Sequence, residues 1–397
     1  MRAEIVTIGS ELLLGQIVDS NGAFIARELA GIGLDLHFKT SVGDNLGRLT
    51  DILKLALSRS EVVITTGGIG PTADDITREA VAQATGCPLE FSTDLMAKIE
   101  AFFRTRGLGV SPSNQRQAYV PRGAIPIPNP VGTAPGFIVE VGAKTIVTLP
   151  GVPREMEHLL TSRVIPYLKD RYHLSGLIQS RILKVCGLGE SRVGEALKDF
   201  MERGFNPTVG TMAHLGQVDI RIAAKAGTPE QAWELMVPVE EEIRRRLGEF
   251  IFGADRDTLE GVVVAALHSR RWRLATIEIG SGGVLSSRVQ GVPDGPTVYR
   301  GGLVASSIAG TLPPPFDRSE PGGSVTELAC AVKEWFHVEV GVSVVIPPVP
   351  KEASIVARVG VATPDMTTEN EFSGGIGVSQ AQGRIATLGL DLIRRRV

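Results

Sequence analysis

The residues best suited to chemistry lie in one glycine-rich segment, TTGGIGPTADDITREA, at residues 65–80. An apolar run, EVVITT, leads into the segment, and a helical pattern follows it. Glycines in such a turn let backbone amides approach an anion, and the N-terminus of the following helix favours negative charge there. The segment therefore predicts a phosphate site, and the residues that could contact the phosphate are Gly67, Gly68, Gly70, Thr72 and Thr77.

Two carboxylates, Asp74 and Asp75, stand inside this segment. Carboxylates beside a phosphate repel it unless a cation lies between them, so their oxygen atoms predict a divalent metal such as Mg²⁺, Mn²⁺ or Co²⁺. The alternative is that one of them only caps the helix while the glycines only form a turn. Because the turn coincides with a strand end, two acids and two threonines, we favour the phosphate and metal site.

Other polar residues follow neighbouring strands and could reach the same place. Glu11 is an acid within the run SELLLG after the first expected strand, and Asn21 ends the DSN sequence that comes shortly after. Asp44 follows the second strand. As alternatives, Glu11 could simply start a helix, and Asp44 could be the N-cap of a helix that begins near Leu46. Two turn-rich segments beside strands add the substrate-binding candidates Gly132, Thr133, Pro150 and Gly151.

Short apolar runs alternate with helical patterns over the N-terminal part of the chain. Such alternation predicts a doubly wound α/β domain with a parallel sheet, in which ligands bind at the carboxyl ends of the strands. The expected strands are residues 3–8, 34–42, 61–66 and 144–149, and the expected helices are residues 21–31, 46–60 and 75–85. The stretch 111–135, rich in Pro, Asn and Gly, is predicted to be an ordered loop region.

Composition bounds the class of protein. The chain has 397 residues, of which 43% are apolar and 21% charged, as expected for a soluble globular protein of two or three domains. The net charge of −3 gives no basic excess, so we do not expect a nucleic-acid partner. The three cysteines are far apart, which favours a reducing compartment. The absence of a basic leader and of a run of about 18 apolar residues predicts a cytoplasmic protein without a membrane span.

The pattern divides the chain into three expected domains. Residues 1–172 hold the doubly wound domain, residues 173–253 a small α+β domain, and residues 254–397 an α/β domain that ends in a long helix. The middle domain shows no obvious chemistry, and we expect it to serve in packing and dimer contact.

Taken together, these segments resemble the CinA family, and the N-terminal part also resembles the molybdopterin-binding fold of MoaB and MogA. The matching strings run in order along the chain: IGSELLLGQIVDSN, VGDN, TTGGIGPTADDITREA, SNQRQAYVP, NPVGTAPGF, LPGVPREM and GLGES. The resemblance covers nearly the whole chain and is densest over residues 1–255. It implies a MoaB/MogA-like three-layer domain, a small middle domain and a C-terminal CinA-type domain, assembled as a homodimer.

The resemblance further implies an activity. The first domain would hydrolyse the pyrophosphate of ADP-ribose, or of a related nucleotide, with a divalent metal, giving AMP and ribose 5-phosphate. Carried onto this chain, the catalytic residues would be Asp74, Asp75 and Glu11, and the metal ligands would be Asp44, Asp74 and Asp75. Which acid is ligand and which is general base stays open at this point. The alternative is a module that binds a pterin or a nucleotide without turnover.

The C-terminal part departs from the pattern of its relatives. CinA-type C-terminal domains resemble nicotinamide mononucleotide deamidases, whose motif Ala-Glu-Ser-Cys-Thr-Gly-Gly corresponds here to residues 277–283 (IEIGSGG). The nucleophile position is then Ile279, and the family's tyrosine and lysine positions are Ser306 and Thr311. An amidase needs an activated nucleophile. We therefore expect a domain that keeps its fold without deamidase activity, although Ser281 could in principle substitute.

Overall fold

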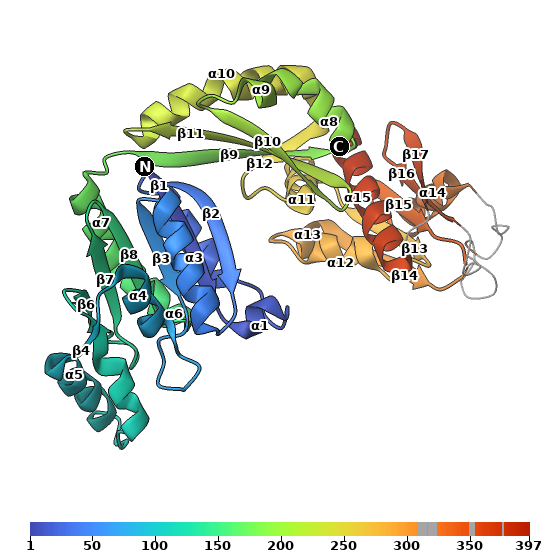
Figure 1. Ribbon diagram of the computed structural model, residues 1–397. Coiled ribbons are helices and arrows are strands. Elements are labelled where there is room, and N and C mark those ends of the chain that lie inside the picture. Colours follow the sequence, from blue (N-terminus) through green and yellow to red (C-terminus); the bar gives the residue numbers. More distant parts are fainter. Residues whose placement is uncertain (308–315, 317–323, 349–353, 375–376) are drawn as a thin grey trace. The chain divides into compact units, whose positions relative to one another are not determined.

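The structure, a computed structural model, describes residues 1–307, 316, 324–348, 354–374 and 377–397 (Figure 1). These residues form two compact units. One unit contains Met1–Gln179 and Lys225–Trp233, and the other contains Ser180–Ala224 and Glu234–Val397. Each unit has buried apolar clusters of its own.

A six-stranded sheet forms the centre of the first unit, in the order β2-β1-β3-β8-β7-β6. Its strands are β1 (Arg2–Ile8), β2 (Asp35–Val42), β3 (Val62–Thr66), β6 (Ile125–Ile127), β7 (Gly136–Val141) and β8 (Lys144–Leu149). The pairs β1–β2, β1–β3 and β3–β8 are parallel, whereas β7–β8 and β6–β7 are antiparallel. The predicted parallel core is therefore confirmed, and an antiparallel hairpin extends it at one edge.

Both faces of this sheet are apolar, because successive residues of a strand point to opposite faces. In β1, Ile5 packs in one buried cluster and Val6 in another. In β3, Ile64 joins the cluster of Ile5, and Val63 joins that of Val6. A strand that is buried on both faces reads as a continuous apolar run, which is why these strands can be recognised from the sequence.

Helices cover both faces of the sheet and give the unit three layers. The cluster that contains Ile5 receives residues from α2 (Ser20–Ala30), α6 (Pro153–Leu159) and α7 (Ile165–Tyr172). The cluster that contains Val6 receives residues from α3 (Leu46–Arg59), α4 (Thr77–Thr85) and α5 (Thr93–Arg104). This doubly wound, three-layer arrangement is the expected fold.

Two parts of this unit differ from the expectation. Residues 111–135 contain η1 (Pro112–Ala118), β5 (Tyr119–Pro121) and β6 rather than loop alone, and β5 pairs with β4 (Leu89–Phe91). Strands of three residues carry too little periodicity to be recognised from sequence. Helix α4 begins at Thr77 rather than near residue 75, because the side chain of Asp75 is engaged with the loop that precedes the helix.

The middle of the chain is α+β, as expected. Its sheet has the order β10-β11-β9-β12, built from β9 (Leu177–Cys186), β10 (Thr208–His214), β11 (Gln217–Ala226) and β12 (Ile251–Ala254). The long helix is α10 (Pro229–Leu247). Two short helices, α8 (Glu190–Ala196) and α9 (Lys198–Arg203), stand between β9 and β10. They meet at Leu197, whose backbone (φ −114°, ψ 9°) leaves the helical region.

A five-stranded sheet, β14-β13-β15-β16-β17, forms the C-terminal part of the second unit. Its strands are β13 (Leu274–Ile279), β14 (Tyr299–Ala305), β15 (Val340–Val345), β16 (Ile355–Ala362) and β17 (Thr367–Gly374). The first three in space are parallel, and β16 and β17 are antiparallel to their neighbours. The α/β class predicted for this part is confirmed.

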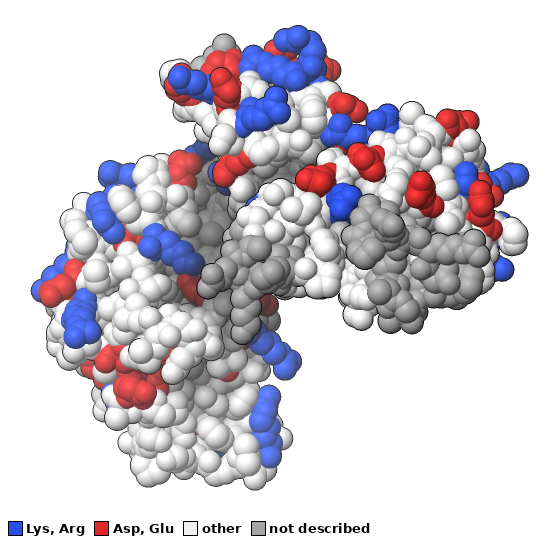
Figure 2. Space-filling model, turned by 90° about the vertical axis from the view of Figure 1, so that its right-hand side faces the viewer, with Lys and Arg blue, Asp and Glu red and all other residues white. Residues whose placement is uncertain are grey.

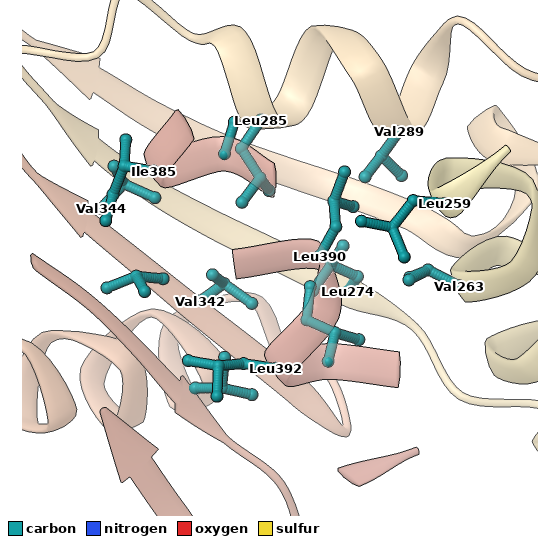
Figure 3. Close-up of a cluster of buried hydrophobic side chains, with 14 of the residues drawn as sticks. Leu259, Val263, Leu274, Leu285, Val289, Val342, Val344, Ile385, Leu390 and Leu392 are labelled. Carbon is teal, nitrogen blue, oxygen red and sulfur yellow. The ribbon is translucent and has the colours of Figure 1, made fainter. Parts of the chain in front are cut away.

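The core of this part lies between the sheet and three helices, α11 (Leu259–Arg270), α12 (Val284–Gln290) and α15 (Val378–Arg396). Figure 3 shows its side chains meeting from both layers: Leu274, Val342 and Val344 from the sheet, and Leu259, Val263, Leu285, Val289, Ile385, Leu390 and Leu392 from the helices. The opposite face of the sheet is covered by α14 (Val325–Phe336). The two clusters bury the central strands β13 and β15, whereas β14 and β17 are partly exposed.

A buried carboxylate joins α15 to the middle of the chain within the second unit. Asp391 is 5% exposed and accepts hydrogen bonds from Arg394 (2.6 Å) and Arg395 (2.9 Å). Arg394 also donates to the carbonyl of Glu249 at 2.7 Å, and Arg395 donates to that of Cys186. Burial, with the nearby Asp391 charge, raises the pKa of the Cys186 thiol to about 12. This thiol is therefore neutral at physiological pH.

Along the described residues, no helix is both long and apolar enough to cross a bilayer. On the face drawn in Figure 2, Lys and Arg side chains are interspersed with Asp and Glu side chains. A surface of mixed sign agrees with the small net charge.

The packing around α15 generates a prediction about stability. Leu390 is fully buried in the core of Figure 3, whereas Leu235 on α10 is 40% exposed. Leu390→Ala should lower the free energy of unfolding of the second unit by about 2–5 kcal/mol, because it leaves a cavity. Leu235→Ala removes the same atoms from a half-exposed place and should cost about 0.5 kcal/mol. Urea unfolding followed by circular dichroism measures both, and equal losses would contradict the packing described.

Candidate functional site

Three parallel strands end at one edge of the first sheet. Ile8 at the end of β1 is followed by Gly9, Thr66 at the end of β3 by Gly67, and Leu149 at the end of β8 by Pro150. Ligands of doubly wound sheets bind at this edge. The residues predicted to form the site therefore follow strands that the sheet brings side by side.

The glycine-rich segment makes a tight turn between β3 and α4. Gly67 (φ 106°) and Gly68 (φ 64°) adopt backbone conformations that side chains disfavour. A Cβ on Gly67 would lie 2.2 Å from the Ile8 carbonyl oxygen, and one on Gly68 would lie 2.3 Å from Thr77 Oγ1. Thr77 donates its hydroxyl to the Gly67 carbonyl at 2.9 Å and its amide to the Gly68 carbonyl at 3.0 Å. The start of α4 is thus tied to the turn.

Asp75 closes the outer part of this turn. One carboxylate oxygen accepts the Gly70 amide at 2.7 Å. The other accepts the Thr72 amide at 2.8 Å and the Thr72 hydroxyl at 2.5 Å. Three hydrogen bonds to one carboxylate give Asp75 a structural part in shaping the turn. Its predicted catalytic and metal-binding roles stay predictions beside this observed one.

Two arginines hold the carbonyl oxygens of the same turn. Arg78 is 2% exposed and donates to the carbonyls of Ile69 and Gly70. Burial lowers its pKa to about 10, against the opposing effect of the nearby carboxylates, so it remains a cation at neutral pH. Arg116 donates to the Thr72 carbonyl at 2.8 Å and pairs with Glu79 at 3.1 Å. The turn is therefore fixed on its carbonyl side by two positive charges.

The amide side of the turn is only partly used. The amides of Gly67, Gly70 and Thr72 already donate, to the Leu149 carbonyl and to Asp75. Within the described part of the chain, the amides of Gly68 and Ile69 have no acceptor. Neighbouring free amides beside a buried arginine are a binding place for an anion such as a phosphate oxygen.

Asp74 differs from its neighbour because its side chain is exposed. The Thr72 hydroxyl, the backbone and then Arg116 lower its pKa, so Asp74 is ionised throughout the neutral range. An exposed, ionised carboxylate beside an anion site can take a cation without being removed from a structural role.

Asp44 lies against the end of β1. Its carboxylate accepts the amide and the hydroxyl of Ser10, both at 2.8 Å. The N-cap of α3 is Asn45, which accepts the Arg48 amide at 3.0 Å, so the alternative of Asp44 as that cap is wrong. Asp44 instead holds the beginning of α1 (Ser10–Leu13).

Glu11 and Asn21 border a cavity of about 110 Å³ at the same edge, with Thr66 and Gly151. Asn21 donates to the hydroxyl of Thr66 at 3.1 Å and to the carbonyl of Gly151 at 2.8 Å. Thr66 in turn donates to the Pro150 carbonyl at 2.8 Å. The amide oxygen of Asn21 is buried and accepts no hydrogen bond within the described residues. Buried polar atoms are usually hydrogen-bonded, so this unpartnered oxygen is an exception.

Gly132 and Thr133 border a different cavity, beside α5. Gly132 faces Glu155, since a Cβ there would lie 2.0 Å from the carboxyl carbon of Glu155. Asn129 donates to that carboxyl at 2.5 Å, and Gln117 donates to the Thr133 hydroxyl at 3.2 Å. Partial burial raises the pKa of Glu155, against the effect of Asn129. These two predicted residues are therefore not beside Glu11 and Asn21, although both cavities belong to the first unit.

The carboxylates of the edge do not form a protein-built metal cage. Among the described residues, no three His, Cys, Asp or Glu side chains come together in a group that could hold a metal ion. The acids present are hard oxygen donors, and Mg²⁺ is commonly held by one or two carboxylates together with substrate phosphates. The residues fit a metal that is shared with a bound phosphate.

The C-terminal part contains the positions at which the deamidase motif of the relatives is changed. Ile279 is 2% exposed at the end of β13. Ser281 is 1% exposed and donates its hydroxyl to Glu278 at 2.8 Å. Glu278 is fully buried and also accepts the amides of Leu285 (3.1 Å) and Ser286 (2.8 Å) at the start of α12. Glu278 and Ser281 thus have structural roles here.

Ser306 and Thr311 are the positions of the family's tyrosine and lysine. Ser306 follows β14 directly. Thr311 lies outside the described residues.

Several residues of the site carry no strong sequence signal. Arg78 and Arg116 are single arginines in polar surroundings, and Thr66 reads only as the end of an apolar strand. Glu155 lies in the string LPGVPREM, where an acid in the first turn of a helix is ordinary. The one available signal is that these residues fall inside the strings that carry the resemblance.

Comparison with known proteins decides the family. A relative from Alkaliphilus oremlandii, named a competence-damage inducible protein, is 38% identical over 417 aligned positions that span 100% of this chain and 99% of the relative. The chain belongs to the CinA family. A CinA-like protein from Dictyoglomus thermophilum is 42% identical over 77% of this chain and 74% of its own length. Residues 4–170 match the family described as "Probable molybdopterin binding domain", and residues 180–253 match the CinA KH domain.

Solved structures of CinA and MoaB proteins give partial matches. CinA from Thermoplasma acidophilum, a protein of unknown function, is 38% identical, covers 43% of this chain and 97% of its own, and has a TM-score of 0.39. MoaB from Thermus thermophilus is 23% identical over 44% of this chain and 94% of its own, with a TM-score of 0.30. Membership of the CinA family rests on the sequence identities rather than on these superpositions.

The turn geometry predicts that two glycine substitutions differ in effect. Gly68 (φ 64°) and Gly86 (φ 70°) share a left-handed backbone, but a Cβ on Gly86 meets nothing within 4 Å. Gly86→Ala should cost only the backbone strain, about 1–2 kcal/mol of unfolding free energy. Gly68→Ala should also displace Thr77 and weaken the binding of a phosphate-bearing ligand such as AMP. Calorimetric titration of both variants with AMP measures this, and equal affinities would contradict an anion site at the turn.

Proposed function

We propose that the first unit hydrolyses the pyrophosphate of ADP-ribose, or of a closely related nucleotide, with Mg²⁺, Mn²⁺ or Co²⁺, giving AMP and ribose 5-phosphate. The observation that carries the proposal is the turn between β3 and α4. In the described residues it leaves the amides of Gly68 and Ile69 without an acceptor, and the same segment carries Asp74, which is exposed and whose pKa is lowered by the Thr72 hydroxyl, the backbone and Arg116. An anion site with an available carboxylate is what a metal-dependent phosphate reaction requires.

The metal would be held by Asp74 together with oxygens of the substrate pyrophosphate. When bound, it would neutralise charge on the phosphates and make phosphorus more open to attack by water. Asp44 and Asp75 already accept hydrogen bonds from Ser10 and from the turn, so we assign them chiefly to holding the site in shape. Of the three metal ligands that the resemblance implies, only Asp74 then remains.

The residues of the neighbouring cavity supply the remaining parts of the reaction. Glu11 is a carboxylate without a hydrogen-bond partner in the described chain, and it borders the cavity of Asn21. We assign Glu11 as the general base that takes a proton from the attacking water. Attack breaks one P–O bond of the pyrophosphate bridge, and the leaving phosphate remains on the amides of Gly68 and Ile69.

A second candidate function is a module that binds a nucleotide or pterin without turnover. It is favoured by the engagement of Asp44 and Asp75, two of the three predicted metal ligands, in hydrogen bonds within the protein. It is disfavoured by the exposure of Asp74, which leaves one of the three predicted ligands accessible to a metal. Glu11 weighs little either way, because it also stands in the first turn of α1. Release of AMP separates the two candidates.

We propose that the C-terminal part has no deamidase activity. Ile279 has no nucleophilic atom, and Ser281, which could have substituted, is buried and donates to Glu278. A cytoplasmic location and a homodimer remain proposals of the same kind, supported by the three free cysteines and by the family resemblance respectively.

Hydrolysis is tested with Asp74→Asn and the matched variant Asp75→Asn. The full chain should release AMP from ADP-ribose only when a divalent metal is added. Asp74→Asn should lower kcat about 100-fold with unchanged thermal stability, because the side chain is exposed and is assigned to the metal. Asp75→Asn should raise KM and lower the unfolding temperature, because it removes the charge that holds Gly70 and Thr72.

Two outcomes of this assay would contradict the proposal. AMP absent with every metal, while AMP itself still binds, would replace hydrolysis by the binding module. Full activity in Asp74→Asn would show that the metal is held elsewhere.

The loss of deamidase activity predicts the behaviour of one further variant. Ile279→Ser restores a hydroxyl at the nucleophile position but not the family's tyrosine and lysine, which are Ser306 and Thr311 here. No ammonia should be released from nicotinamide mononucleotide by the wild-type chain or by this variant. Ammonia formed by either of them, measured in a coupled assay, would overturn this account of the C-terminal part.

A further inference from the structure

The string GLGES, which carries part of the resemblance but has no place in the proposed function, borders a cavity of the second unit. The cavity has a volume of about 390 Å³, which is in the range of small-molecule sites. Three segments line it: the loop that follows β9, the turn between β10 and β11 with the strand ends beside it, and the facing parts of β17 and α15. None of the lining residues belongs to residues 277–283, the segment of the changed deamidase motif.

Direct contacts hold the turn between β10 and β11 against α15. Gly216 (φ 77°) lies in this turn, and a Cβ on it would lie 3.2 Å from the Cγ2 atom of Thr387. The side chain of Leu215 reaches Gly383 on the helix, where a Cβ would lie 2.7 Å from its Cδ2 atom. Glycine at these two positions lets the turn and the helix approach closely. The walls of the cavity are therefore fixed by the packing of the second unit.

Arg384 of α15 lines this cavity and is not neutralised by the protein. Its Nε atom is buried and has no hydrogen-bond partner in the described part of the chain. Arg394 and Arg395 on the same helix pair with Asp391, whereas Arg384 has no ion pair with a described residue. Its guanidinium carbon lies over the ring of Phe372, 5.3 Å from the ring centre. A guanidinium that rests on an aromatic face keeps the N–H groups of its edge for other partners.

The charges of the cavity favour an anion at Arg384. Among the lining residues, all of them described, Arg384 is the one Lys or Arg and Glu190 the one Asp or Glu. Glu190 is exposed in the first turn of α8, so water can solvate its carboxylate, whereas the Nε atom of Arg384 is cut off from water. Beside His214, the carboxylate of Asp219 already accepts from Lys184 at 2.7 Å. A buried donor without an acceptor is costly, and a ligand that supplies the acceptor removes that cost.

We propose that this cavity binds a small oxyanion, a carboxylate or a phosphate group, through the guanidinium edge of Arg384. Both groups present two oxygen atoms at the spacing of the guanidinium fork. His214 and Gln217 also line the cavity and have side chains that can donate to further oxygens. Because the cavity belongs to the second unit, the proposal does not depend on the hydrolysis assigned to the first unit.

Helix α15 supplies a matched pair of substitutions for the test. Arg384→Gln removes the charge and the fork from the cavity. Arg396→Gln removes the same charge from an exposed position on the same helix that does not line the cavity. Neither arginine has an ion pair to lose within the described residues, so both variants should fold, which thermal unfolding checks. A third variant, Arg384→Lys, keeps the charge but removes the fork.

The experiment is an NMR titration of the full chain, with isotope-labelled histidine, against inorganic phosphate and, separately, against succinate. His214 lines the cavity and reports on it, and the variant His214→Gln assigns its resonance. We expect at least one of the two anions to shift the His214 resonance, and the one that does so identifies the bound group. Arg384→Gln should raise the Kd of that anion about tenfold or more, Arg384→Lys should raise it less, and Arg396→Gln should leave it unchanged.

Two results would overturn the proposal. One is a His214 resonance that neither anion shifts, which is also the result expected if phosphate binds only at the turn after β3. The other is an equal affinity of the Arg384→Gln and Arg396→Gln variants, which would show that the anion does not bind through Arg384. Neither result bears on the release of AMP from ADP-ribose, so this proposal and the proposed function can fail separately.

Discussion

The hydrogen bonds of Asp75 to the turn that follows β3 are the interaction on which the candidate site depends. They engage the amides of Gly70 and Thr72, whereas the amides of Gly68 and Ile69 have no acceptor among the described residues. Arg78 balances the buried side of the turn with a positive charge. Because a carboxylate of the chain shapes the turn, the anion site that we propose there would be formed by the protein itself.

Much of the fold could be predicted because its strands are buried on both faces and read as apolar runs. The parallel strands β1, β3 and β8 and the helices α2 and α3 follow directly from such runs and from the helical periodicity between them, whereas β2 is largely exposed and is not an apolar run. The three-residue strands β4, β5 and β6 could not be predicted, because so short a segment shows no periodicity and its pairing partner decides its structure. Gly194 stands three residues before the break at Leu197, but a glycine within a helical pattern does not fix where the helix breaks.

For the candidate site, the sequence predicts which residue types are present but not how their side chains are arranged. The glycines and acids of the turn were found because a strand end, glycines and a helix start coincide there. Sequence could not separate the exposed Asp74 from its neighbour Asp75, whose side chain is turned into the loop, since the two acids are adjacent. Nor could it show that Gly132 and Thr133 border their own cavity, because that depends on where α5 packs. Side-chain direction, not residue type, is the information that the sequence lacks.

The proposed function therefore depends on different roles for two adjacent acids: Asp75 shapes the turn, and Asp74 would face the ligand. The most direct measurement is a crystal structure of the chain with AMP and Mn²⁺, in which anomalous scattering locates the ion. The account predicts phosphate oxygens on the amides of Gly68 and Ile69 and the ion at Asp74, with the hydrogen bonds of Asp75 to Gly70 and Thr72 intact. An ion bound by Asp75 in a rearranged turn, or a phosphate bound away from the turn, would contradict it.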